Sequence, residues 1–267
     1  MSVSVPVRAS ALAPASTSRP TAAVPTSDDS LRLEAITVSV GFDDYLDVTL
    51  GLNHPHLDTM VVVTSMTDVK TQAVCRKHGA MCVQTDLIEK NGRAFNKGAA
   101  INAGFAHLQY RGWRMHLDAD VILPDNFRWI VFNHTHLDAD VIYGADRVNL
   151  IGADELKKYL STLTPQHFQG LLVQAAADPA RPIGARIVST LHGYLPLGCF
   201  QLWHVSCQKP YPYSLGTAAH DDMMFAALWP LSKRQLLPSV IIYHLCSQEP
   251  TWGENWEGDR GQPRFLR

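Results

Sequence analysis

The chain has 267 residues, of which 46% are apolar and 18% charged, so it can hold one large α/β domain or two small ones. Its 23 basic and 25 acidic side chains give a formal net charge of −2, which carries no electrostatic signature of nucleic-acid binding. Five cysteines without a Cys-x-x-Cys pair disfavour a zinc ribbon and favour a reducing compartment. Because no apolar run approaches the ~20 residues of a membrane-spanning helix, we expect a cytoplasmic protein.

Residues 1–30 are rich in Ala, Ser, Thr and Pro and contain no acidic side chain before Asp28. Such a segment cannot bury enough apolar surface to order itself, so we predict a disordered tail. An organelle transit peptide has the same composition and is the alternative. A single folded domain is then expected over residues 31–267.

Short apolar strands alternate with amphipathic helices in the next part of the chain. Strands are predicted at residues 35–40, 59–64 and 81–84, and helices at residues 45–52 and 69–78. This order predicts a parallel, Rossmann-like sheet flanked by helices, whose ligands lie at the carboxyl ends of the strands. Asp43 and Asp68 follow the first two strands and are candidates for holding a nucleotide. The alternative is that both are turn or helix-capping residues.

Two cations precede a further helix. Arg93 and Lys97 come just before Ile101, Phe105 and Leu108, which have the spacing of one helix face. Cations beside the unpaired N–H groups at the start of a helix form a favourable binding site for a diphosphate. Ordinary surface cations are the alternative.

Residues 115–125, MHLDADVILPD, place two carboxylates in an otherwise apolar run. An unpaired buried carboxylate is costly, so Asp118 and Asp120 need a partner. Alternate residues of an extended segment point the same way, so both side chains can reach one ion. Oxygen ligands suit Mg²⁺ or Mn²⁺, and these ions commonly bridge phosphates. The run therefore predicts a metal–diphosphate site.

The heptapeptide HLDADVI occurs twice, at residues 116–122 and 136–142. The first copy is led in by Trp113 and Met115, as a strand would be, and is the favoured site. The second is predicted to be a loop that leads into an ordinary strand, with Asp140 at the start of that strand.

Two further segments carry polar side chains at the ends of apolar elements. His220, Asp221 and Asp222 lie together at a predicted helix start, where the helix dipole stabilises carboxylates and where one could serve as a general base. Residues 239–243 form a strongly apolar strand, and His244 at its end is a candidate metal ligand.

Residues 197–204 also read as a strand, and its aromatic side chains suggest two alternatives. Phe200 and Trp203 could form a platform for a sugar or acceptor, or they could pack in the core.

The order of four segments resembles that of the GT-A glycosyltransferases. These segments are residues 95–105, 116–127, 198–204 with 220–225, and 243–244. The pattern is similar to family 2 and to the catalytic domains of β-1,4-galactosyltransferases and polypeptide N-acetylgalactosaminyltransferases. Two features depart from it: His220 stands where a glutamate is usual, and the Trp-Gly-x-Gly before the acidic cluster is absent.

The resemblance implies a single-domain GT-A fold with a mixed, mostly parallel sheet. It implies an inverting, metal-dependent transfer of a sugar from a nucleotide-sugar to an unidentified hydroxyl acceptor. The expected donor is a UDP-sugar, with a GDP-sugar as the second choice, and the expected cofactor is Mn²⁺ or Mg²⁺. The implied roles are a metal site at Asp118, Asp120 and His244, ribose contact by Asp118, diphosphate contact by Arg93 and Lys97, base catalysis by Asp221 and acceptor binding by Asp222.

Two other functions remain open from the residues alone. A sugar-phosphate nucleotidyltransferase would need a basic, Gly-rich loop after the first strand, whereas residues 40–44 (VGFDD) are acidic. A non-catalytic nucleotide- or sugar-binding domain would not need the full set of carboxylates and histidine.

Overall fold

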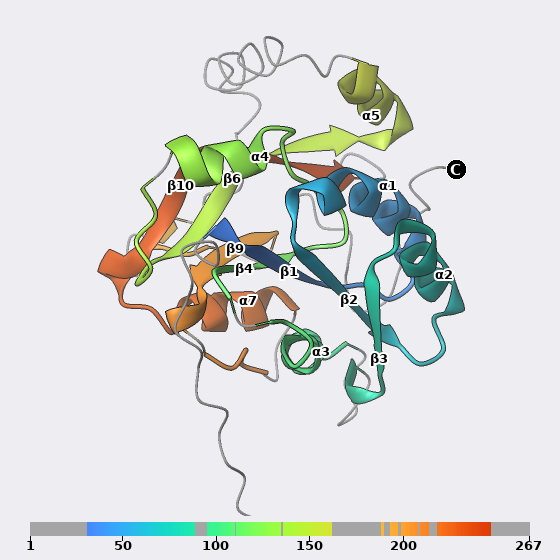
Figure 1. Ribbon diagram of the computed structural model, residues 1–267, viewed down its shortest axis with the longest axis horizontal. Coiled ribbons are helices and arrows are strands. Elements are labelled where there is room, and N and C mark those ends of the chain that lie inside the picture. Colours follow the sequence, from blue (N-terminus) through green and yellow to red (C-terminus); the bar gives the residue numbers. More distant parts are fainter. Residues whose placement is uncertain are drawn as a thin grey trace, which may run out of the picture.

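The computed structural model describes residues 31–88, 95–109, 111–134, 136–161, 188–189, 193–196, 199–207, 209–213 and 218–246 (Figure 1). Within them, strands are β1 (Leu33–Val38), β2 (Thr59–Ser65), β3 (Met81–Thr85), β4 (Trp113–Leu117), β5 (Val121–Ile122), β6 (Ile142–Ile151), β7 (Val188–Ser189), β8 (Gly193–Tyr194), β9 (Phe200–His204) and β10 (Arg234–Cys246). The α-helices are α1 (Asp43–Asn53), α2 (Val69–His78), α3 (Lys97–Phe105), α4 (Phe127–Trp129), α5 (Gly152–Ser161) and α7 (Ala218–Ala226). Single turns of other helix types cover His54–His56, Ile130–His134, Val205–Cys207 and Leu231–Lys233.

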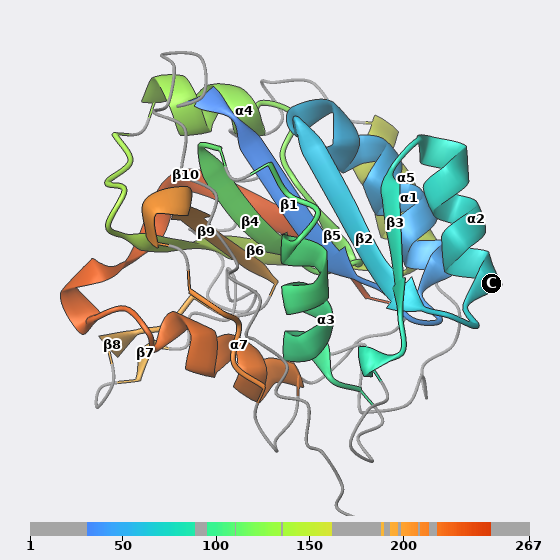
Figure 2. The same cartoon turned by 60° about the horizontal axis from the view of Figure 1, so that its bottom comes forward.

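One sheet of eight strands forms the centre of the molecule, in the order β3-β2-β1-β4-β9-β6-β10-β5. The pairings give β1, β2, β3, β4, β6 and β10 one direction, while β9 and β5 run the opposite way. Helices α1 and α2 lie on one side of this sheet, and α3 and α7 lie on the other (Figure 2). The predicted Rossmann-like arrangement, a mixed and mostly parallel sheet flanked by helices, is confirmed.

Strands β1 and β2 are buried on both faces, as expected for parallel strands covered by helices on both sides. Along β1, Ala35 belongs to the core on the side of α1, while Ile36 belongs to the core on the side of α3. Phe200 and Trp203 are both 1% exposed and point into these two cores, so the core-packing alternative is correct for them.

Most predicted elements are found within two residues of their expected ends, and α2 has the predicted limits. Helix α3 stops at Phe105, so Leu108 lies beyond it, and β10 starts five residues before the predicted strand. His244 therefore lies inside β10, two residues before its end, and not after it. The second HLDADVI copy is a turn followed by β6, and Asp140 precedes that strand by two residues.

None of the described helices is long and apolar enough to cross a membrane. The predicted tail over residues 1–30 lies outside the described residues, and the predicted domain limits stay a prediction.

Helix α3 begins against the extended segment at residues 209–213. A Cβ atom on Gly98 would stand 2.1 Å from the carbonyl oxygen of Pro212, which is backbone and cannot swing away. We expect Gly98→Ala to lower the free energy of unfolding by about 2–3 kcal/mol, because α3 and that segment must separate. Urea denaturation measures this.

The matched control is Gly51→Ala in the last turn of α1, where the added Cβ meets only the side chain of His78. Alanine is the better helix former by about 1 kcal/mol, so this variant should be at least as stable as the wild type. Equal losses in both variants would contradict the close approach at Gly98.

Candidate active site

The first HLDAD segment is a chain reversal at the carboxyl end of β4. Strand β4 ends at Leu117, and the chain then turns so that β5 pairs antiparallel with β10, with Val121 opposite His244. The amide of Leu245 also donates to the carbonyl oxygen of Asp120 at 2.8 Å. This short ladder brings the second aspartate of the motif next to the histidine of β10.

Buried polar side chains hold the backbone of this reversal. Thr37 Oγ1 donates to the carbonyl of Leu117 at 2.8 Å, and Thr49 Oγ1 donates to the carbonyl of Ala119 at 2.7 Å. Asn53 Nδ2 donates to the carbonyl oxygen of residue 121 at 2.7 Å, and its Oδ1 accepts the amide N–H of residue 123 at 2.8 Å. These bonds satisfy backbone groups that would otherwise be buried without partners. Sequence reasoning missed all three residues, because nothing in their local pattern marks them.

Asp120 Oδ2 and His244 Nε2 are 3.3 Å apart. The other ring nitrogen of His244 lies 3.2 Å from Asn149 Oδ1 and 3.3 Å from Cys246 Sγ. Burial lowers the pKa of His244, but the Asp120 carboxylate outweighs this and holds that pKa well above its ordinary value. As it stands, the pair is a buried charge-assisted contact.

The pair also fits a divalent cation. Two adjacent ligands of an octahedral ion, each at about 2.1 Å from it, stand about 3 Å from each other. Among the described residues, no group of three or more His, Cys, Asp or Glu side chains could hold a metal. A Mg²⁺-type site does not need one, because such ions keep several waters and take further ligands from phosphates.

Lys97 lies between the two acidic clusters predicted from the sequence. Its Nζ donates to Asp118 Oδ1 and to Asp222 Oδ2, both at 2.8 Å, and only 6% of its side chain is exposed. His116 is fully buried on the other side, with Nε2 at 3.3 Å from Asp118 Oδ1. The first aspartate of the motif is therefore held by two basic side chains, while 29% of its own side chain reaches solvent.

The charges of this cluster affect each other. Burial raises the pKa of Asp118, but the ammonium of Lys97 and the ring of His116 outweigh it and hold that pKa well below its ordinary value. Burial raises the pKa of Asp222, and Lys97 offsets this only in part. Burial lowers the pKa of Lys97, but the two carboxylates keep it charged.

Helix α7 brings Asp221 and Asp222 to the start of α3. Asp221 has no exposed surface, and its Oδ2 accepts the amide N–H of Gly98 at 3.3 Å. Asp222 Oδ1 contacts the hydroxyl of Tyr211, whose ring stacks on Phe225 at 4.3 Å between centroids. Sequence reasoning missed Tyr211, which lies in a Pro-Tyr-Pro-Tyr stretch without a helix or strand pattern.

The remaining predicted residues have varied surroundings. Asp68 caps α2 through the amide of Thr71 and also accepts the amide of Gly41, whose positive φ of 69° closes the turn after β1. Its capping role is confirmed, and a nucleotide contact stays a prediction. Asp43 is the first residue of α1, the His220 side chain is exposed, and Arg93 lies outside the described residues.

Arg147 is a further cation near the pair of Asp120 and His244. It lies on β6, and its Nη1 donates to Cys199 Sγ at 2.7 Å. Burial lowers the pKa of Arg147, but the Cys199 sulfur and the Asp120 carboxylate raise it, so it stays charged. In the sequence, Arg147 is marked only as a cation on a predicted strand. The structure shows that this strand, β6, pairs with β10.

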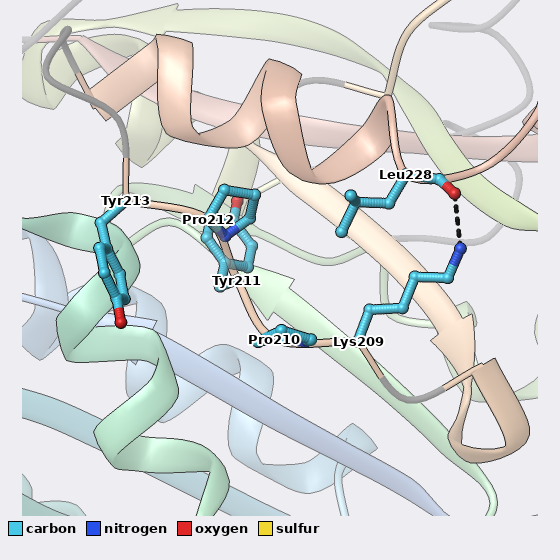
Figure 3. Close-up of a pocket in the computed structure, with 6 residues that line it drawn as sticks. All are labelled: Lys209, Pro210, Tyr211, Pro212, Tyr213 and Leu228. Carbon is cyan, nitrogen blue, oxygen red and sulfur yellow. Dashed lines mark hydrogen bonds between the residues drawn. The ribbon is translucent and has the colours of Figure 1, made fainter.

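A separate surface pocket lies behind Tyr211 (Figure 3). It is lined by Lys209, Pro210, Tyr211, Pro212, Tyr213 and Leu228. Lys209 donates to the Leu228 carbonyl at 2.5 Å and lies 4.4 Å from the centre of the Trp229 ring. The pocket shares only Tyr211 with the candidate site.

No protein-family model matches the chain, and no curated protein matches it significantly. Among solved structures, it is similar to mannosyl-3-phosphoglycerate synthase from Rubrobacter xylanophilus, with 16% identity, a TM-score of 0.49, and coverage of 82% of this chain and 67% of the other. Glucosyl-3-phosphoglycerate synthase from Mycobacterium tuberculosis, solved with Mn²⁺, UDP and glucosyl-3-phosphoglycerate, has 12% identity, a TM-score of 0.45, and coverage of 82% of this chain and 73% of the other. These similarities do not assign an activity to this chain.

We expect Thr49→Val to lower the free energy of unfolding by about 1–3 kcal/mol, because the variant keeps the shape of the side chain but leaves the Ala119 carbonyl buried without its donor. Urea denaturation measures this. Thr49→Ser retains the hydroxyl and should lose less than half as much. Equal losses of unfolding free energy in Thr49→Val and Thr49→Ser would show that the hydroxyl does not stabilise the reversal.

We expect Lys97→Met to lower the free energy of unfolding by about 3–5 kcal/mol at pH 7, because it leaves the partly buried Asp118 carboxylate and the buried Asp222 side chain without their cation. The lowered pKa of Asp118 contributes stability above the ordinary Asp pKa of about 3.9, and this contribution is lost as pH falls. The gap between variant and wild type should therefore stay constant from pH 7 down to about pH 5 and narrow as pH falls below about 4.

Urea denaturation at pH 7 and at about pH 3 measures the difference in the free energy of unfolding between Lys97→Met and the wild type. Lys157→Met removes an exposed lysine that pairs only with exposed Asp154, and should change stability by less than about 0.5 kcal/mol. A gap for Lys97→Met that does not depend on pH would contradict the assigned charges.

Proposed function

We propose that the protein is a metal-dependent glycosyltransferase of the GT-A, family 2-like type. It moves a sugar from a nucleotide-sugar, with UDP favoured over GDP, to an acceptor hydroxyl. The proposal includes the similarity to β-1,4-galactosyltransferase and polypeptide N-acetylgalactosaminyltransferase catalytic domains that the four segments suggested.

One observation supports the proposal most directly. The Asp-x-Asp motif and His244 come from distant parts of the chain, yet the Asp120 carboxylate and the His244 imidazole lie 3.3 Å apart at the carboxyl end of the sheet. Ligands of open α/β sheets bind at that end of the strands. Had the first HLDAD segment lain away from His244, the metal–diphosphate hypothesis would have failed.

Each residue has a proposed task. Asp120 and His244 hold the divalent cation, which would stabilise the negative charge on the leaving diphosphate. Asp118, the more exposed member of its cluster, binds the ribose. Arg93 binds the diphosphate as a second cation.

Lys97 is proposed to bind the diphosphate as well, in addition to the cation and Arg93. Because its ammonium is bound to Asp118 and Asp222, this contact requires that a phosphate oxygen replace one carboxylate oxygen. Such an exchange keeps the buried ammonium paired throughout.

The proposed reaction is a single displacement. The acceptor oxygen bonds to the anomeric carbon while the bond from that carbon to the phosphate oxygen breaks, so the anomeric configuration inverts. Asp221 takes the hydroxyl proton and Asp222 holds the acceptor. Since Asp221 is fully buried, its oxygen must become accessible when the acceptor binds.

The first experiment measures the release of UDP from UDP-glucose and UDP-galactose with Mn²⁺ and without acceptor, with GDP-mannose as the second donor class. Slow, Mn²⁺-dependent release of the nucleotide supports a transferase. Tight nucleotide binding without any release supports the non-catalytic alternative. Pyrophosphate-dependent formation of UTP supports a nucleotidyltransferase.

We expect Asp120→Ala to abolish both turnover and Mn²⁺-dependent UDP binding, because it removes a proposed protein ligand of the cation. The matched control is Asp140→Ala in the second HLDAD copy, where the side chain is 73% exposed and 4.0 Å from Lys233. That variant should bind and turn over like the wild type. Calorimetric titration with UDP and Mn²⁺ measures binding, and normal binding by Asp120→Ala would show that this residue is not the ligand.

We expect Asp221→Asn to reduce transfer at least about 100-fold while it leaves UDP binding unchanged, because it removes a proton acceptor. The asparagine oxygen can still accept the Gly98 amide, so the start of α3 keeps its partner. The initial rate of UDP release and the melting temperature together separate chemistry from folding. Full activity in this variant would remove Asp221 from the mechanism.

A further inference from the structure

The Tyr211 hydroxyl touches two acceptor oxygens. It lies within hydrogen-bond distance of Asp222 Oδ1 and 2.9 Å from Gln201 Oε1, and the Tyr211 side chain is 1% exposed. A phenolic hydroxyl has one hydrogen, whereas a carboxylate oxygen and an amide oxygen have none. The two contacts therefore need one hydrogen more than Tyr211 supplies.

The Gln201 amide cannot supply that hydrogen. Its Nε2 already donates to the carbonyl oxygens of Pro196 at 2.8 Å and Asp222 at 3.0 Å. Exchanging the amide oxygen and nitrogen would place Oε1 against two carbonyl oxygens, which would all be acceptors. The orientation of the amide is thus set by its other two partners, and the missing hydrogen must belong to Asp222.

The charge balance leads to the same conclusion. Lys97 carries one positive charge between Asp118 and Asp222, and the side chains of Lys97 and Asp222 are 6% and 3% exposed, whereas that of Asp118 is 29% exposed. Two ionised carboxylates would leave a buried net negative charge, which is costly, whereas one proton on Asp222 makes the cluster neutral. A charged His116 would also balance the cluster, but its Nδ1 is 3.9 Å from Asp222 Oδ1 and adds no hydrogen to the Tyr211 contacts.

We propose that Asp222 is a neutral carboxylic acid whose Oδ1–H donates to the Tyr211 oxygen, while Tyr211 donates in turn to Gln201. Tyr211 and Gln201 are then positioning residues that fix both the orientation and the protonation state of Asp222. The hydrogen-bond chain runs in one direction, from Asp222 through Tyr211 and Gln201 to the Pro196 carbonyl. Asp222 has no capacity to act as a base in this state, which leaves proton removal to Asp221.

The inference does not rest on the proposed function, and its test needs no substrate. The full chain, free of metal and nucleotide, is labelled with ¹³C at the aspartate carboxyl carbons, and Asp222→Asn assigns the Asp222 signal. An ordinary aspartate has a pKa of about 3.9 and is ionised at pH 6. We expect the Asp222 signal to remain that of a neutral acid at pH 6, and an ionised signal there would overturn the proposal.

Tyr211→Phe distinguishes the two possible directions of the hydrogen bond. If Asp222 donates, the variant removes the acceptor of a neutral acid, and the pKa of Asp222 falls by about one unit or more. If Tyr211 instead donates to an ionised Asp222, the variant removes a bond to the anion, and that pKa rises. A rise therefore overturns the proposal.

Gln201→Met provides a second measurement if Tyr211→Phe fails to fold. Without the Gln201 oxygen, the Tyr211 hydrogen is free to turn to Asp222 and stabilise its anion, so the pKa of Asp222 should fall. No change in that pKa would contradict the proposed chain.

Tyr143→Phe is the matched control, because the Tyr143 hydroxyl accepts the Asp138 amide at 2.7 Å near the amino end of β6. It should leave the Asp222 titration unchanged. A protein that proves inactive on every nucleotide-sugar would end the proposed function but would leave this result valid.

Discussion

The connection from β4 to β5 constrains the whole sheet. Only the residues between Leu117 and Val121 separate the two strands, so their ends are at most ~14 Å apart along an extended chain. In the sheet, however, β9, β6 and β10 lie between them, and four flat strand spacings would cover ~19 Å. A flat sheet cannot satisfy both, so the sheet must curl, and this curl brings β10 back towards the end of β4.

That curl explains why the candidate site is where it is. The reversal after Leu117 has to bury carbonyl groups that no strand can pair, and hydroxyls and an amide from β1 and α1 provide the donors. Once the reversal is held, the pairing of Val121 with His244 follows from the β5–β10 ladder. The contact of Asp120 with His244 therefore depends on Thr37, Thr49 and Asn53, none of which is a proposed ligand of the cation.

The sequence predicted the parts of this structure that arise from local patterns. Alternating apolar runs located β1, β2 and β3, and Asp68 with Gly79 marked the two ends of α2. The motif also predicted the region of the site, because carboxylates at the end of an apolar strand need a partner. What it could not predict was the pairing between distant segments: Lys97 with both Asp118 and Asp222, or Tyr211 with Asp222. Those pairs depend on how α3, α7, the end of β4 and the segment 209–213 pack together, which no local period encodes.

The repeated heptapeptide shows how much this packing decides. In the second copy, Asp138 accepts the amide N–H of Asp140 at 2.9 Å and pairs with the half-exposed Lys233. The Asp138 carboxylate is therefore stabilised by a surface lysine and by solvent. In the first copy, the same seven residues span the end of β4, the reversal and β5, and lie among buried partners. Carboxylates in water have little need of a further cation, whereas buried ones gain from each opposite charge that reaches them. The capacity proposed for HLDADVI, to hold a cation and a diphosphate, would therefore come from the curled sheet around the first copy.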